Sequence, residues 1–211
     1  MYIKKVLHRN RVVDIPCYID EKTVENFSKF TDENAFQIYF EEAFEDEDSI
    51  QRSDAGGIQI SIGLVKNPNV EDPLGWSPIM IAISSHCDDI VQVLAPFIGN
   101  SNAKIRGLLS PMEYAILLNY NEIIKLLAPF CDHYQIPSQP IGLGLRYNAY
   151  ESGMSLIHMA VDCENAEAIK ILAPFMKTPN APSDNGTTPI QMATRKFGPN
   201  HDIVQILQTF Q

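Results

Sequence analysis

The tetrapeptide Leu-Ala-Pro-Phe occurs three times in this chain, at residues 94–97, 127–130 and 172–175. The copies begin 33 and then 45 residues apart. Other residues keep a fixed distance from each copy, so the chain contains a repeat with a basic period of 33 residues. The recurring positions are a serine with the next residue (Ser77-Pro78, Ser110-Pro111, Ser155-Leu156) and an alanine four residues after that next residue (Ala82, Ala115, Ala160).

Each copy predicts two short helices. A serine or threonine followed by proline is a helix start, because the hydroxyl caps free amide groups and proline is tolerated in the first turn. Apolar residues at i, i+1 and i+4, such as Ile90, Val91 and Leu94, then predict a second helix with one buried stripe. Proline disfavours the α region for the residue before it, so this helix is expected to stop near Ala95, Ala128 and Ala173. The phenylalanine after it is expected to bridge to the next repeat.

A fourth copy occupies residues 186–210, with Thr188-Pro189 as the helix start and Ala193 in register. Where the other copies have Leu-Ala-Pro-Phe, it has Leu207-Gln-Thr-Phe. With Gln205, these residues make one side of the second helix polar. A polar outer face is typical of the last repeat in a stack, so we expect the stack to end here.

The four helix starts read SPIMIA, SPMEYA, SLIHMA and TTPIQMA, and the unit resembles the ankyrin repeat, which carries T-P-L-H-x-A at a period of 33. The resemblance implies a mostly α fold, a solenoid of stacked helix-turn-helix units with β-hairpin fingers. His86, Asn119 and Glu164 stand where that family has glycine between the helices. We expect an ankyrin-repeat domain over residues 66–211, with repeats at about 72–98, 105–131, 150–176 and 183–211 and an insertion in the finger at 131–153.

Residues 1–65 carry no pattern of a known family. Residues 2–8 and 11–19 are typical of short strands around a turn, and residues 20–30 and 31–44 are typical of helices. Alternating isoleucines at 58, 60 and 62 predict a further strand over 56–64. This segment is interpreted either as a degenerate capping repeat or as a small independent α/β unit.

The chain of 211 residues has a net charge of −10. Residues 31–48 contain eight acidic side chains and no basic one. This charge disfavours direct binding to nucleic acid or to an anionic membrane surface, and no apolar run is long enough to span a membrane. The four cysteines form no CxxC pair, which suits free thiols in a reducing compartment, so we expect a cytoplasmic and possibly nuclear protein without bound metal or cofactor.

Three groups of residues are candidates for partner contact. Trp76 precedes a helix start in a slot that is usually polar, and is either a partner anchor or a plug against the N-terminal segment. The resemblance places the row of Ile81, Tyr114, Met159 and Met192, together with Leu117, on the groove, although these side chains could instead pack between neighbouring helices. The inserted finger adds tyrosine and arginine, residue types that dominate binding hot spots, unless they pack on one another (Arg146, Tyr147, Tyr150).

No nucleophile, metal or phosphate motif occurs in the sequence. His158 with Cys163 and Glu164 could suggest catalysis, but their spacing along one short helix does not form a nucleophile–base pair, and His158 is expected to be a structural histidine. The sequence therefore predicts a non-enzymatic, monomeric scaffold or adaptor that binds another protein. One alternative is an acidic ankyrin-type inhibitor of a basic partner such as a transcription factor. A second is an enzyme with a catalytic N-terminal unit.

Overall fold

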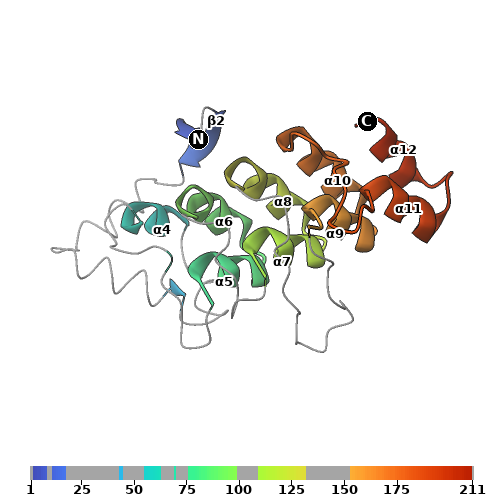
Figure 1. Cartoon of the computed structure of the whole chain (residues 1–211). Helices are drawn as coiled ribbons and strands as arrows, with labels where there is room; N and C mark the ends of the chain where they lie inside the picture. Colours follow the sequence, from blue (N-terminus) through green and yellow to red (C-terminus); the bar gives the residue numbers. More distant parts are fainter. Residues whose placement is uncertain are drawn as a thin grey trace. The chain divides into compact units, whose positions relative to one another are not determined.

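A computed structural model describes residues 2–8, 11–17, 43–44, 55–62, 69, 76–98, 109–131 and 153–210 (Figure 1). The chain divides into two compact units, residues 1–106 and 107–211. The boundary lies in the segment after the first Leu-Ala-Pro-Phe copy. Both units contain the same element, a pair of short helices, and in three of the four described pairs a 3₁₀ turn follows the second helix.

The first unit begins with a two-stranded antiparallel sheet, β1 (Tyr2–His8) and β2 (Arg11–Cys17), in which Val6 pairs with Val13. These strands confirm the predicted hairpin. The helices predicted at 20–30 and 31–44 lie outside the described residues, except for Ala43 and Phe44. The unit also contains α4 (Ala55–Ser61), the pair α5 (Pro78–Ser84) and α6 (Asp88–Leu94), and the 3₁₀ turn η1 (Ala95–Phe97).

The predicted strand over 56–64 is wrong, because this segment forms helix α4. Ile58 and Ile62 are four residues apart and both are buried, with the equally buried Ser61 donating to the Ile58 carbonyl at 3.1 Å. The first and last of the three isoleucines therefore also fit one face of a helix turn. Helix α4 begins 33 residues before α6 and packs against it. We infer that α4 is the second helix of a further repeat, so the repeats begin before residue 66 and the capping-repeat interpretation is favoured.

The second unit contains three helix pairs. They are α7 (Pro111–Leu117) with α8 (Asn121–Leu127), α9 (Leu156–Asp162) with α10 (Ala166–Leu172), and α11 (Pro189–Phe197) with α12 (Asp202–Gln208). The first helices of the pairs pack on one another in the order α7, α9, α11, and the second helices in the order α8, α10, α12 (Figure 1). We call these the inner and outer helices. The four predicted helix pairs are confirmed.

The core of the second unit lies between its two layers of helices. Large aliphatic side chains from both layers are fully buried, and the recurring alanines are also buried, so that inner helices approach their neighbours closely. The exposed residues of α11 and α12 are polar or charged, among them Gln191, Thr194, Gln205 and Gln208. The predicted polar side of the fourth repeat is therefore present.

The three Ala-Pro-Phe segments each form a 3₁₀ turn directly after an outer helix: η1 in the first unit, then η2 (Ala128–Phe130) and η3 (Ala173–Phe175). The α-helices end at the preceding leucines, as predicted. However, Ala95 keeps α backbone angles (φ −51°, ψ −40°) instead of leaving the α region. The effect of proline on the preceding residue is a preference, and here proline enters a turn that closes with the Ile98 amide donating to the Ala95 carbonyl at 3.3 Å.

The phenylalanines that end these turns do not share one environment. Phe130 is 4% exposed, as expected for a bridge between repeats, whereas Phe97 is 40% exposed and Phe175 is half-buried. The turn therefore recurs in all three Leu-Ala-Pro-Phe copies, but only in the second of them is its last side chain buried.

Leu172→Ala is expected to cost about 2–5 kcal/mol of unfolding free energy, because its side chain is fully buried on α10, which packs against both α8 and α12. Leu207→Ala is the matched control. Leu207 is equally buried, but α12 has only α10 as a neighbouring outer helix among the described elements. Denaturant titration should give the smaller loss for Leu207→Ala, and a larger loss there would contradict the stacking model.

The loops between paired helices contain the only non-glycine residues with positive φ in the described segments: His86 (56°), Asn119 (57°) and Glu164 (54°). A left-handed backbone costs a residue with a Cβ atom about 1–2 kcal/mol. Glycine pays no such cost, which explains why the repeat pattern favours it there.

Glu164→Gly should therefore be more stable than Glu164→Ala by about 1 kcal/mol, since both variants lose the carboxylate and only alanine keeps the strained Cβ. Thermal and denaturant unfolding of the two variants would measure the difference. Equal stabilities would show that the loop does not impose the left-handed conformation.

Candidate protein-binding surface

The inner helices are fixed at their starts by capping boxes. In α7 the Ser110 amide donates to the Glu113 carboxylate at 2.6 Å, and the Glu113 amide donates back to the Ser110 hydroxyl at 3.2 Å. The same reciprocal pair forms between Ser155 and His158 in α9 and between Thr188 and Gln191 in α11. These bonds satisfy the free amide groups of a helix start and set the direction in which each inner helix presents its side chains.

Helix α5 begins with the same Ser-Pro signal but lacks the reciprocal bond, because Met80 stands at the third position of the helix. The Ser77 hydroxyl is buried and has no hydrogen-bond partner in the described part of the chain. The Ser-Pro dipeptide is therefore sufficient to start a helix without a capping box, since proline and apolar packing still define where the helix begins.

His158 is fully buried, and both of its ring nitrogens are engaged. Nδ1 accepts from the Ser155 amide at 3.0 Å, which leaves Nε2 to donate to the Thr187 carbonyl at 3.0 Å. The second bond ties α9 to the loop that precedes α11. The prediction of a structural histidine is confirmed, and the ring cannot act as a base for Cys163 without losing these bonds.

The last turn of each inner helix leaves two adjacent positions accessible. In the second unit these residues are half-buried or exposed, while most of the preceding residues in α7 and α9 are buried. Because α7, α9 and α11 are successive neighbours, the accessible pairs follow one another across the unit. We define the inner-helix row as these six residues: Leu117, Leu118, Asp162, Cys163, Arg195 and Lys196.

The expected groove row needs a correction. Met159 is 1% exposed and Ile81 is 6% exposed, so neither offers a surface to a partner. Met159 stands on α9, which packs against both α7 and α11. Tyr114, Met192 and Leu117 are half-buried and keep an accessible part. The inner-helix row therefore consists of the residues three and four positions after Tyr114, Met159 and Met192.

The other predicted contact residues fall in separate places. Trp76 is half-buried immediately before α5 in the first unit. Arg146, Tyr147 and Tyr150 lie outside the described residues, so their role stays a prediction.

The charged contacts at and near the inner-helix row involve α11 and His201, the residue that caps α12. The Lys196 ammonium pairs with the Asp162 carboxylate at 2.8 Å and also donates to the Asp162 carbonyl at 2.6 Å, at the end of α9. A cation at a helix C-terminus is favourable because of the helix dipole. His201 Nε2 lies 3.6 Å from Glu164, and its ring stacks on Phe197 at 4.6 Å. These contacts join the last two helix pairs near the row, and Arg195 has no ion pair in the described part of the chain.

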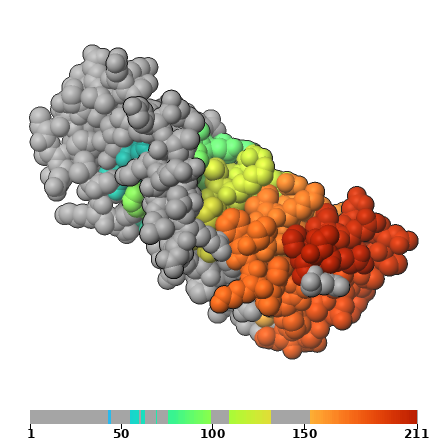
Figure 2. Space-filling view, turned by 90° about the horizontal axis from the view of Figure 1, so that it is seen from above, coloured from blue at the N-terminus to red at the C-terminus, as the bar shows by residue number. Residues whose placement is uncertain are grey.

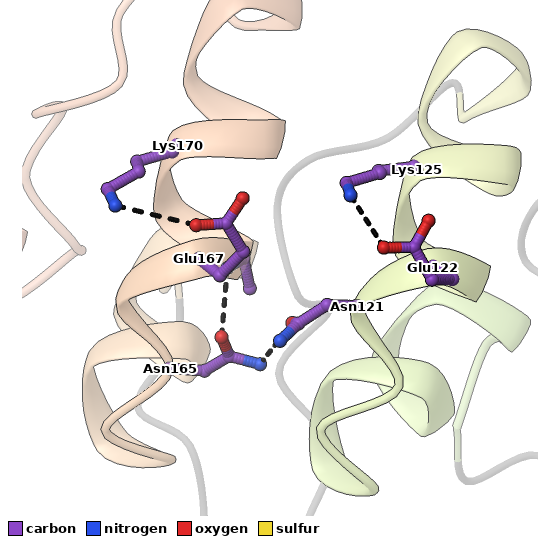
Figure 3. A network of polar contacts seen from close by, with 7 residues as sticks. Asn121, Glu122, Lys125, Asn165, Glu167 and Lys170 are labelled. Atoms are coloured by element: carbon purple, nitrogen blue, oxygen red, sulfur yellow. Dashed lines mark hydrogen bonds and ion pairs between the residues drawn. The ribbon is translucent and has the colours of Figure 1, made fainter.

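The outer helices present a different surface. Figure 2 looks down on the molecule from above Figure 1, the side on which α8, α10 and α12 lie within the second unit, and Figure 3 shows part of two of these helices from close by. Glu122 pairs with Lys125 at 2.6 Å on α8, and Glu167 pairs with Lys170 at 3.4 Å at the corresponding place on α10. The hydrogen bond to Glu122 raises the pKa of the Lys125 amine. All four side chains are largely exposed, and such pairs contribute little to stability. Their charges cancel locally, which is typical of a solvated surface.

A buried polar link lies beside these pairs (Figure 3). The Asn165 side chain caps α10 by accepting from the Ala168 amide at 2.9 Å, and its amide group donates to the Asn121 side chain on α8 at 2.9 Å. One residue therefore both begins an outer helix and bonds to the neighbouring one.

Asn165→Ala should cost about 1–2 kcal/mol of unfolding free energy, because it removes a helix cap as well as the link to α8. Asn121→Ala removes the link alone and should cost about 1 kcal/mol or less. Denaturant unfolding of both variants would test this order. If Asn121→Ala were the more damaging change, the cap would not be the larger contribution.

Three of the cysteines, Cys87, Cys131 and Cys163, are half-buried and form no disulfide. Burial raises the pKa of the Cys87 thiol above its ordinary value of 9.0, and the neighbouring charges of Asp88 and Asp89 raise it further. A raised pKa lowers the thiolate fraction near neutral pH, so this thiol is poorly suited to act as a nucleophile.

In a variant that keeps Cys87 and has serine at the other three cysteines, alkylation by iodoacetamide should reach half its maximal rate at a higher pH than alkylation of a free cysteine does. Adding Asp88→Asn should move that midpoint to lower pH by removing a negative charge. Rates measured between pH 7 and 11 would check both. A midpoint at or below that of a free cysteine would contradict the environment described for this thiol.

Among the described residues, no group of three or more potential metal ligands comes together, and no helix there is long and apolar enough to cross a membrane. Residues 52–139 match the family model described as ankyrin repeats (3 copies). The match begins just before α4 and includes α5 through α8. A search of curated proteins gave no match to this sequence.

Proposed function

Because this chain is an ankyrin-repeat protein, whose repeats are modules for protein–protein interaction, we propose that it works as a scaffold or adaptor that binds one protein partner. The partner is proposed to contact the inner-helix row of the second unit together with Tyr114. The inserted finger, with Arg146, Tyr147 and Tyr150, and Trp76 in the first unit are proposed as further contacts.

The observation that carries this proposal is the inner-helix row itself. Its side chains stand on helices whose starts are held by capping boxes and whose packed faces are buried, so their positions are fixed before a partner arrives. A rigid surface loses little conformational entropy on binding. The outer surface, in contrast, holds locally neutralised Glu–Lys pairs.

The acidic composition supports a second candidate. With a net charge of −10 and eight acidic residues between 31 and 48, the chain could bind a basic surface and act as an inhibitor of that partner. Under this alternative the acidic segment, rather than the inner-helix row, contributes most of the affinity. The cysteine pattern supports a reducing compartment such as the cytoplasm for either role.

The test begins with affinity capture of partners by the full chain from cells of its source, followed by mass spectrometry. With the captured partner in hand, Tyr114→Ala, Leu117→Ala, Trp76→Ala and Tyr147→Ala should each weaken binding at least about tenfold. The matched controls Lys125→Ala and Lys170→Ala on the outer helices should leave the affinity nearly unchanged.

Thermal unfolding separates binding from folding, because a contact residue should alter affinity with little change in Tm. Loss of binding in the lysine variants alone would overturn the proposed surface. Binding that disappears at high salt and survives all four aromatic and leucine changes would favour the acidic inhibitor instead.

A further inference from the structure

The inner-helix row changes in chemistry from one end to the other. At α7 it consists of two leucines, Leu117 and Leu118, both partly accessible and three and four residues after the half-buried Tyr114. At α11 it consists of two cations, Arg195 and Lys196, both exposed. An apolar end and a cationic end on one rigid scaffold indicate a ligand that carries both an apolar and an anionic group.

The middle of the row is already neutral. Asp162 on α9 holds the Lys196 ammonium at 2.8 Å, so the carboxylate and the ammonium compensate one another. The Lys196 side chain is further fixed by the Asp162 carbonyl and lies 5.3 Å from the centre of the Phe197 ring. A ligand that crosses this part of the row needs no charge of its own.

Arg195 differs from the other cations of the described side chains. Lys125, Lys170 and Lys196 each pair with an acidic residue, whereas Arg195 and Lys177 have no ion pair there. Of these two, Arg195 stands on a helix in the row, and Lys177 lies in the loop after η3. A guanidinium group donates two parallel hydrogen bonds to a carboxylate, which makes Arg195 a specific binding site for an acidic side chain.

The spacing of the helices sets the spacing of the ligand groups. Packed helices lie about 8–10 Å apart, so the leucines of α7 and the arginine of α11, two helices on, are about 20 Å apart. An extended chain advances about 3.3 Å per residue, and it covers that distance in about six residues.

We propose that the inner-helix row of residues 107–211 binds an extended peptide segment of its partner that carries a large apolar side chain and, about six residues away, an aspartate or glutamate. The apolar side chain packs against Leu117 and Leu118, and the carboxylate pairs with Arg195. This proposal rests on the proposed function, since it specifies the chemistry of the partner at the same surface. This protein has a net negative charge, but the local positive charge of Arg195 favours a peptide with a negative charge at that position.

The experiment uses a displayed library of random twelve-residue peptides, selected on the full chain. Enriched peptides should share a leucine, isoleucine, methionine or aromatic residue and an acidic residue five to seven positions away. Labelled synthetic copies, measured by fluorescence anisotropy, should lose at least about tenfold in affinity to Arg195→Glu and to Leu117→Asn. Lys170→Glu, an equally exposed charge reversal on an outer helix, should have no such effect.

A charge swap makes the test independent of folding defects. A peptide whose acidic residue is replaced by lysine should bind the unaltered chain weakly and regain affinity for Arg195→Glu. The proposal would be overturned if the selection gave no enrichment of the expected pattern, or if it enriched basic or purely apolar peptides. It would also be overturned if removing the peptide carboxylate lowered the affinity for Arg195→Glu as much as it lowers the affinity for the unaltered chain. If the peptide test fails in one of these ways but Tyr114→Ala still weakens binding of a captured protein partner, the proposed function stands. Only the proposed chemistry of the partner segment is then wrong.

Discussion

Burial of apolar side chains between one helix pair and the next is the constraint on which this structure depends. A helix of seven residues is too short to be stable by its own hydrogen bonds, and most helices here have that length. Each pair becomes stable only because its neighbour covers the remaining apolar stripe. Within residues 107–211 this burial runs in two layers, α7–α9–α11 and α8–α10–α12, and the alanines of the inner helices allow the close approach.

Polar bonds then decide how each pair is oriented. Capping boxes at Ser110, Ser155 and Thr188 fix where the inner helices begin, and the Asn165–Asn121 bond aligns the outer helices α10 and α8. His158 reaches from one repeat to the backbone of the next. Ser110, Glu113, Ser155, His158 and Asn165 are buried, so leaving any of these groups unpaired would cost free energy, and the arrangement that satisfies all of them is favoured over alternatives.

The candidate binding surface follows from the same constraint. Residues that pack between neighbouring helices, such as Met159, are withdrawn from the surface, and the positions left over at the end of each inner helix are free to vary without damage to the core. In residues 107–211 those positions hold leucine, aspartate, cysteine, arginine and lysine. A surface that carries little of the stability can change its chemistry, which is why a repeat scaffold suits recognition.

The sequence by itself determined the local elements of this protein. Ser-Pro and Thr-Pro starts, the Ile-Val and Leu spacing, and the proline after each outer helix specify the helix pairs, since each signal acts within a few residues. The hairpin at residues 2–17 was predictable for the same reason. Candidate contacts were harder to predict: Leu117 was found as an accessible residue, whereas Arg195 was missed because an isolated arginine in a helix has no distinguishing pattern.

Tertiary structure decided the rest. The alternation of Ile58, Ile60 and Ile62 predicts a strand, but Ile58 and Ile62 alone also fit one face of a helix. The structure forms the helix α4, which packs against α6. The accessible part of each inner helix depends on which side its neighbours cover, so Met159 and Ile81 became core while the residues three and four positions later stayed accessible. The contacts of α4 with α6 and of α9 with α7 and α11 join residues about 30 or more positions apart. The free energy of such a contact is not contained in any short stretch of sequence.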